Sequence, residues 1–141
     1  TPMSLVLTAA PAVEPVTLAE AKLHLRVDHT DEDAFIASLI VTSRLHIEAA
    51  LGVVLITQSW TESRDAWPSG RELELSLRPV RSIDFIRVAT APASFTTLPA
   101  ADYILDGGAA KSRVVLHAAA TRPVPAVPAS GNHRGAQAAR G

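Results

Sequence analysis

The fold of this 141-residue chain is decided by residues 16–60, which read VTLAEAKLHLRVDHTDEDAFIASLIVTSRLHIEAALGVVLITQSW. Thr17 and Glu20 have the spacing of a capping box, in which each side chain bonds a free backbone N–H group at the start of a helix. Apolar residues follow at helical spacing and form a short apolar face: Leu18, Ala21 and Leu25. This pattern predicts a short helix over residues 17–27.

Acidic residues then interrupt the apolar pattern: Asp28, Asp31, Glu32 and Asp33. Such a run is typical of a helix start, where carboxylates favour the positive end of the helix dipole and Thr30 or Asp31 serves as the cap. A calcium or magnesium site is the alternative interpretation. The spacing does not match an EF-hand loop, and the required glycine and distal glutamate are missing. We therefore interpret the run as a second helix start without a metal.

A long helix is predicted over residues 31–51, where apolar residues repeat at three- and four-residue steps. Gly52 follows at a position where glycine commonly ends a helix in the left-handed conformation. Arg44 and Glu48 are four residues apart, and we expect them to form an ion pair on the polar side of this helix.

Beyond the long helix, the apolar period changes from 3.6 to 2, which predicts strands from residue 53 to residue 117. In one of these strands Leu73, Leu75 and Leu77 alternate with polar residues, which predicts one buried and one solvated face. Residues 1–15 contain three prolines and are interpreted as an extended arm. Residues 118–141 are rich in alanine, proline and glycine without apolar periodicity, and are predicted to be an extended, disordered tail. The fold class is α+β, with an N-terminal helical pair, a small antiparallel β-sheet and the C-terminal tail.

Composition places the chain among ordinary globular proteins, with 48% hydrophobic residues, 19% charged residues and a net charge of -1. Cysteine is absent, which excludes disulfides and thiolate catalysis. No uninterrupted apolar stretch approaches the length of a membrane span, so no membrane partner is expected. The near-neutral balance gives no general reason to bind nucleic acid. Residues 118–141 carry a charge of +3 and no acid, so the other 117 residues carry -4.

Motifs of enzyme chemistry are missing, and we expect no enzyme, no cofactor and no metal. The five histidines have no HExxH or other metal-ligand spacing. No G-x-S-x-G nucleophile turn occurs. The Asp106-Gly107-Gly108 segment lacks the remaining residues of a phosphate loop and precedes a predicted strand, so it is interpreted as a hairpin turn.

Candidate contact residues fall into two groups. Trp67 stands beside Pro68 at a predicted turn, where an exposed indole could anchor a partner, and three arginines provide the charge of the tail. The candidate partner interface comprises Trp67, Arg122, Arg134 and Arg140. Four more arginines of the β region either protect solvated strand edges or face DNA or an acidic partner: Arg71, Arg78, Arg81 and Arg87.

The order of these elements resembles the gp6-like head–tail connector (adaptor) family of tailed phages, prophages and gene transfer agents. The resemblance lies in the capped segment from Val16, in Asp31-Glu32-Asp33 leading to Leu39-Ile40, and in Ile56-Thr57-Gln58-Ser59-Trp60. Later motifs are similar too: Leu77-Arg78-Pro79-Val80-Arg81-Ser82-Ile83 and Ala101-Asp102-Tyr103-Ile104-Leu105-Asp106. The resemblance covers about residues 14 to 117 and marks 16–117 as a connector domain.

The resemblance implies a structural protein of the virion neck, assembled in the bacterial cytoplasm. It would form a homo-oligomeric ring, usually dodecameric, that joins the portal protein to a stopper or other tail-proximal protein. DNA would pass through the ring without sequence-specific binding. The chain departs from the family where further helices, which help to grip the portal, are replaced by residues 118–141. The alternatives are another ring component, such as a stopper or tail terminator, and a small nucleic-acid-binding module.

Overall fold

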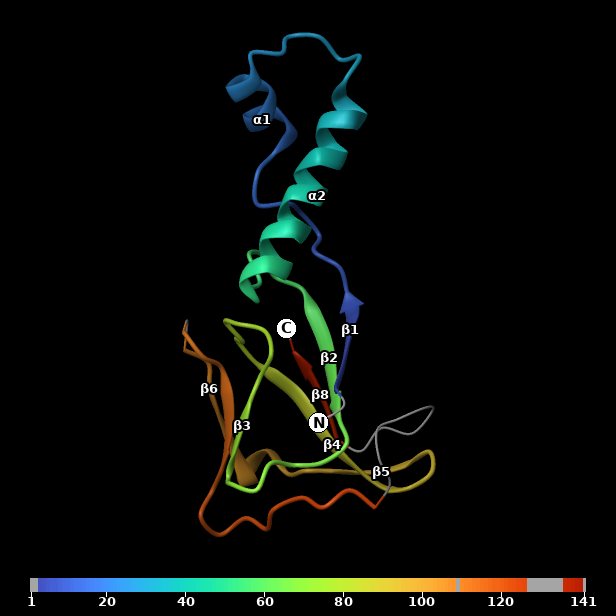
Figure 1. Cartoon of the computed structure of the whole chain (residues 1–141), viewed down its shortest axis with the longest axis vertical. Coiled ribbons are helices and arrows are strands. Elements are labelled where there is room, and N and C mark those ends of the chain that lie inside the picture. The colour runs from blue at the N-terminus through green and yellow to red at the C-terminus, as the bar shows by residue number, and fades with distance from the viewer. Residues whose placement is uncertain (1–2, 109, 127–135, 141) are drawn as a thin grey trace. The chain divides into compact units, whose positions relative to one another are not determined.

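The computed structural model describes residues 3–108, 110–126 and 136–140, and it divides the chain into two compact units (Figure 1). Residues 11–57 form a helical unit. Residues 1–10 together with 58–141 form a β unit. This α+β composition confirms the predicted fold class, because a helical pair precedes small antiparallel sheets.

The helical unit contains α1 (Leu18–Leu25) and α2 (Asp33–Leu51). The predicted capping box is present, because the Glu20 amide donates to Thr17 Oγ1 at 3.1 Å and the Thr17 amide donates to Glu20 Oε2 at 2.9 Å. The bond from the Thr17 amide, followed by an interaction with the Thr17 side chain, lowers the pKa of the Glu20 carboxyl below its usual value. Helix α1 ends at Arg26, which has a left-handed φ of 59°.

The start of α2 differs from the prediction, whereas its end confirms it. Glu32 occupies the N-cap position and makes no side-chain cap bond, so a cap at Thr30 or Asp31 is wrong. Asp33 in the first turn instead pairs with Lys22 at 2.6 Å. This ion pair links the two helices. At the other end Gly52 has a φ of 63°, and its amide donates to the Glu48 carbonyl.

The β unit contains a five-stranded sheet in the order β1-β2-β8-β4-β5. Its strands are β1 (Met3–Ala9), β2 (Ser59–Arg64), β8 (Ala136–Arg140), β4 (Ile83–Ala91) and β5 (Ser94–Thr97). A three-stranded sheet has the order β3-β7-β6, with β3 (Glu72–Glu74), β7 (Arg113–Leu116) and β6 (Tyr103–Asp106). A short 3-10 helix, Ala100–Asp102, precedes β6. Every strand pair is antiparallel, as predicted.

The two ends of the chain contribute strands that the sequence pattern did not predict. The predicted arm contains β1, which pairs with β2, and the predicted tail contains β8, which pairs with both β2 and β4. The first strand of the β region begins at Ser59 and not at 53. The division of the chain into an arm, a connector domain and a tail stays a prediction.

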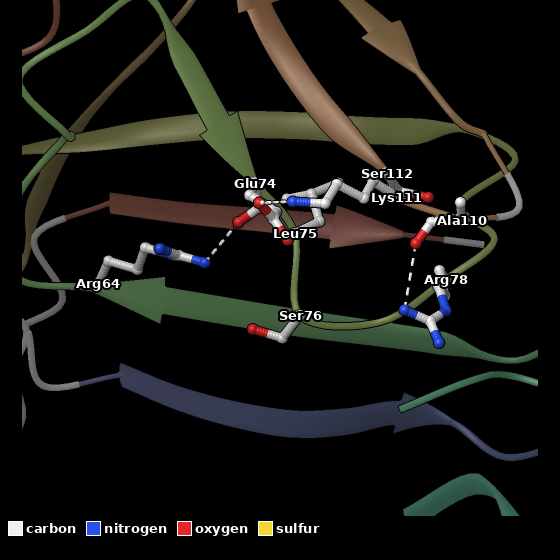
Figure 2. Close-up of a pocket in the computed structure, with 8 residues that line it drawn as sticks. All are labelled: Arg64, Glu74, Leu75, Ser76, Arg78, Ala110, Lys111 and Ser112. Atoms are coloured by element: carbon white, nitrogen blue, oxygen red, sulfur yellow. Dashed lines mark hydrogen bonds and ion pairs between the residues drawn. The ribbon is translucent and has the colours of Figure 1, made fainter. Parts of the chain in front are cut away.

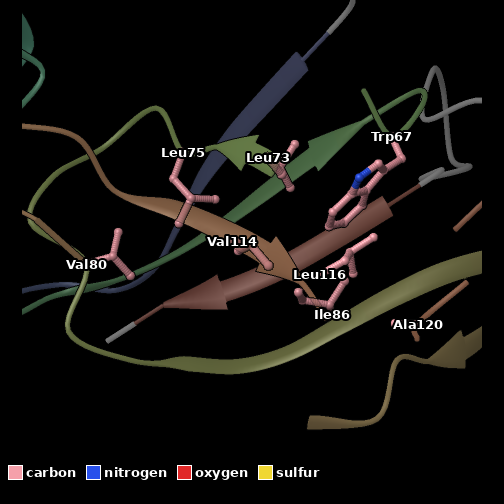
Figure 3. Packing of buried hydrophobic residues seen from close by; sticks show 8 residues of the cluster. All are labelled: Trp67, Leu73, Leu75, Val80, Ile86, Val114, Leu116 and Ala120. Atoms are coloured by element: carbon pink, nitrogen blue, oxygen red, sulfur yellow. The ribbon is translucent and has the colours of Figure 1, made fainter. Parts of the chain in front are cut away.

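The core of the β unit is a cluster of buried side chains that point toward one another in Figure 3: Trp67, Leu73, Leu75, Val80, Ile86, Val114, Leu116 and Ala120. Leu73 and Leu75 are 6% and 5% exposed, which confirms the predicted alternation of this segment. The predicted exposure of Trp67 is wrong, because its indole packs into this cluster and is 7% exposed. A side chain so covered is not available as an anchor for a partner.

Candidate functional site

The helical unit exposes most of its large apolar side chains, which together we call the apolar helical surface. Its members are Leu23, Leu25, Phe35, Leu39, Val41, Leu45, Ile47 and Leu51, exposed by 37% to 82%. The only buried residues of the described helix α2 are Ile36, Arg44 and Glu48. Helix α2 is therefore inverted relative to an ordinary surface helix, which buries its apolar side and exposes its charges.

The exposed apolar residues surround α2 and do not form a single stripe. At about 100° per residue, they fall into three i,i+4 pairs that face three different directions around the helix. The pairs are Phe35 with Leu39, Ile47 with Leu51, and Val41 with Leu45. A helix that is apolar all round is normally covered on all sides. Within one chain, this helix is therefore left uncovered on more than one side.

An apolar groove lies within the helical unit, with a volume of about 300 Å³. Residues from α1, α2 and the two flanking segments line it, among them Val16, Leu25, Leu39, Ile47 and Leu55. These side chains provide few polar partners, so the groove suits a large apolar side chain better than a polar ligand.

A buried ionic cluster holds the segments that flank the helices. Arg44 is 7% exposed, and its Nε and Nη2 donate to the two carboxylate oxygens of Glu14 at 2.5 and 3.2 Å. Arg44 Nη1 donates to Glu48 Oε2 at 2.9 Å, while Glu48 Oε1 accepts the Leu55 amide at 2.9 Å. The hydrogen bonds to Glu14 raise the pKa of Arg44 by more than burial lowers it. The predicted ion pair between Arg44 and Glu48 is present, but its predicted place on the polar side of the helix is wrong, because both side chains are buried.

The β unit contains a basic cleft of about 270 Å³, which Figure 2 shows. Its charged residues come from the end of β2, from β3 and the segment after it, and from the segment before β7. The cations are Arg64, Arg78 and Lys111, and the single lining carboxylate belongs to Glu74. Of these four residues only Arg78 was predicted from the sequence, because the other three are far apart in the chain and share no motif.

Each cation of the basic cleft has a partner within the protein. Arg64 Nη2 pairs with Glu62 at 2.6 Å and donates to the Glu74 carbonyl at 2.6 Å. Lys111 Nζ pairs with Glu74 Oε2 at 3.2 Å, and Arg78 Nη1 donates to the Ala110 carbonyl at 3.1 Å. Burial lowers the pKa of Arg64, and the charge of Glu74 offsets part of this effect.

The other three predicted arginines of the β region do not line this cleft. Arg71 donates through Nη2 to the carbonyl oxygens of His117 and Ala120, the latter at 2.7 Å. The guanidinium of Arg87 lies over the ring of Phe85, 4.2 Å from its centroid. Arg81 is exposed. A role of these arginines in facing DNA or a partner stays a prediction.

Two of the three predicted interface arginines of the tail belong to the described residues. Arg122 Nη1 donates to the Ser69 carbonyl at 2.7 Å and thereby holds the tail against the turn after Trp67. Arg140 belongs to β8, where its backbone is opposite Trp60 and Ile83. Arg134 lies outside the described residues. No group of three or more potential metal ligands occurs among the residues that the structure describes.

Comparisons with known proteins place this geometry in context. Residues 15–84 match a family model described as phage gp6-like head-tail connector protein. No curated protein matches the chain significantly.

Chains of similar fold occur in solved structures of gene transfer agent (GTA) particles. The chain from "Neck of empty GTA particle computed with C6 symmetry" has a TM-score of 0.79 and 22% identity, and the match covers 97% of this chain and 69% of that one. The chain from "Virion of native gene transfer agent (GTA) particle" has a TM-score of 0.71 and 21% identity, and the match covers 96% of this chain and 69% of that one. The chain from "Neck of native GTA particle computed with C12 symmetry" has a TM-score of 0.62 and 20% identity, and the match covers 95% of this chain and 68% of that one. At these identities the matches establish a shared fold.

Proposed function

Because this chain belongs, through residues 15–84, to the phage gp6-like head–tail connector family, we propose that it is a structural ring component of a virion neck. In this proposal the ring is dodecameric, joins the portal to the tail and extends the DNA channel. The particle is a phage or a gene transfer agent assembled in the bacterial cytoplasm. Two structures with similar chains are necks computed with C6 and C12 symmetry, and a ring of twelve is compatible with both.

The observation that carries the proposal is the inverted helix α2. A subunit in a cyclic ring contacts one neighbour with one surface and the other neighbour with a different surface. Apolar pairs that face several directions fit this arrangement, because two neighbours can cover different sides of the same helix. Each Å² of the apolar helical surface that a neighbour covers would stabilise the assembly by about 25 cal/mol, because that area is removed from water.

The apolar groove provides a second contact of the same kind. A large apolar side chain of the neighbouring copy would enter the groove between α1 and α2. The ionic cluster around Arg44 keeps the helical pair and its flanking segments in place before assembly. Each single contact can then be weak, because closing a ring repeats it and every subunit is held from two sides.

A membrane is a less suitable environment for the same helix. Helix α2 is 19 residues long and apolar enough to cross a membrane by length and composition alone. Arg44 and Glu48, however, lie in the helix and are fixed to Glu14, which comes from a separate segment. Moving this charged cluster into lipid is costly. A protein neighbour therefore fits the helix better than lipid does.

Assembly of the purified protein tests this proposal. We expect native mass spectrometry and negative-stain microscopy to detect closed rings, alone or on added portal. Leu45→Glu and Phe35→Glu should abolish assembly and leave the helical circular dichroism unchanged, because both side chains are more than half exposed within one chain. Val124→Glu is the matched control, since Val124 is a 75% exposed apolar residue of the β unit. Equal assembly of all four proteins would refute ring formation through the helices.

A further inference from the structure

The basic cleft has features of a site for a negatively charged group. Three cations meet one carboxylate in a cavity of about 270 Å³. The cations approach from three separate segments, so the fold concentrates positive charge that is scattered in the sequence. The chain as a whole is slightly acidic, so the positive charge of the cleft is a local feature.

The cleft already holds one carboxylate of the protein itself. Glu74 Oε2 lies 3.2 Å from Lys111 Nζ, and the backbone of Glu74 accepts from Arg64. Glu74 and Lys111 are 63% and 69% exposed, so their ion pair is hydrated and weak. An incoming carboxylate can therefore replace Glu74 beside Lys111 at little cost.

A protein carboxylate fits the cleft better than a DNA backbone. Duplex DNA presents a continuous row of phosphates and favours an extended basic stripe. The neighbouring arginines do not extend the cleft into such a stripe, because Arg71 and Arg122 do not line it and Arg113 pairs with Asp106 and Glu72. A compact group of cations is instead suited to one or two acidic side chains.

We propose that the basic cleft binds a carboxylate side chain from an acidic segment of a partner protein. Arg78 and Lys111 make the new ion pairs, and Arg64, whose charge is balanced by the buried Glu62, holds the backbone of Glu74 in place. The proposal concerns the β unit alone and does not require a ring. Its failure is therefore distinguishable from failure of assembly through the helices.

Binding of a fluorescein-labelled hexaglutamate peptide, followed by anisotropy at low ionic strength, tests the site. We expect Arg78→Gln to weaken binding by about tenfold, as for loss of a hydrogen bond to a charged group. Glu74→Gln should strengthen binding, because it removes the internal competitor. The matched controls are Arg81→Gln and Glu72→Gln, which change the net charge equally but lie outside the cleft.

The controls make the outcomes decisive. Gain of affinity in Glu74→Gln but not in Glu72→Gln would support the site, and a misfolded variant cannot produce that result. Equal effects of Arg78→Gln and Arg81→Gln would overturn the proposal in favour of diffuse attraction. Absence of hexaglutamate binding would overturn it as well. A duplex DNA of similar charge that binds more tightly, with the same dependence on Arg78, would replace the carboxylate by a phosphate.

Discussion

Replacement of Arg44 by methionine should destabilise the helical unit by about 3 kcal/mol, because it leaves two carboxylates without their cation. Breaking a buried ion pair costs about 3 to 5 kcal/mol. The lower end applies here, since Glu48 is 10% exposed but Glu14 is 25% exposed and can be partly hydrated. Urea unfolding followed by circular dichroism at the helical band measures this loss, because both α-helices belong to the helical unit.

The matched control is Arg113→Met in the β unit. Arg113 also bonds two carboxylates, Asp106 at 2.8 Å and Glu72 at 2.9 Å, but it is 43% exposed. Exposed pairs of this geometry contribute little, so its urea midpoint should hardly change. A neutral variant, Glu14→Gln with Arg44→Met and Glu48→Gln, should recover much of the stability that Arg44→Met loses. Equal destabilisation by Arg44→Met and Arg113→Met would refute the explanation by burial.

Substitutions at three further positions test the fold. Trp67→Ala should lower the free energy of unfolding by about 3 to 5 kcal/mol, measured in urea by tryptophan fluorescence, because it leaves a cavity in the core. Trp67→Phe should lower it much less. Equal losses in the two variants would exclude cavity formation as the cause. Gly107→Ala should lower the thermal midpoint, because a Cβ there would meet the Val80 carbonyl oxygen, and an unchanged midpoint would contradict this close approach. Thr17→Ala should cost about 1 kcal/mol through loss of the cap. The pKa of Glu20 is lowered from 4.5 in the folded chain, so the ionised Glu20 carboxylate stabilises the fold above that pH. This stabilisation is lost as the pH falls through the folded pKa. The difference in unfolding free energy between Thr17→Ala and wild type should therefore shrink in acid.

Local patterns predicted the parts of the structure that depend on neighbouring residues. The capping box of Thr17 and Glu20 and the left-handed Gly52 are set by groups within a few positions of each other. The alternation around Leu73 and Leu75 predicted which side of that segment is buried. These features follow from backbone hydrogen bonding and from side-chain period, both of which can be read in a single segment.

Features that depend on distant segments were not predicted. Strand β1 pairs with β2, more than fifty residues later in the chain, and no local pattern specifies such a partner. The inversion of α2 was missed because periodicity assumes that apolar residues face the interior of the same chain. Arg44 instead bonds Glu14, thirty residues away, while most large apolar residues of the helix stay exposed within the single chain. The basic cleft was not predicted because its cations come from segments that are far apart in the sequence.

Averaged cryo-electron microscopy of particles that carry this chain tests the central claim most directly, with a tagged copy to identify its density. The account predicts a ring of this chain between the portal and the tail, with α2 of each subunit covered by its neighbours. The position of the density also distinguishes a connector from a stopper or a tail terminator, which would lie further along the tail axis. Density for this chain outside the neck, or a neck in which the apolar helical surface contacts only water, would contradict the account.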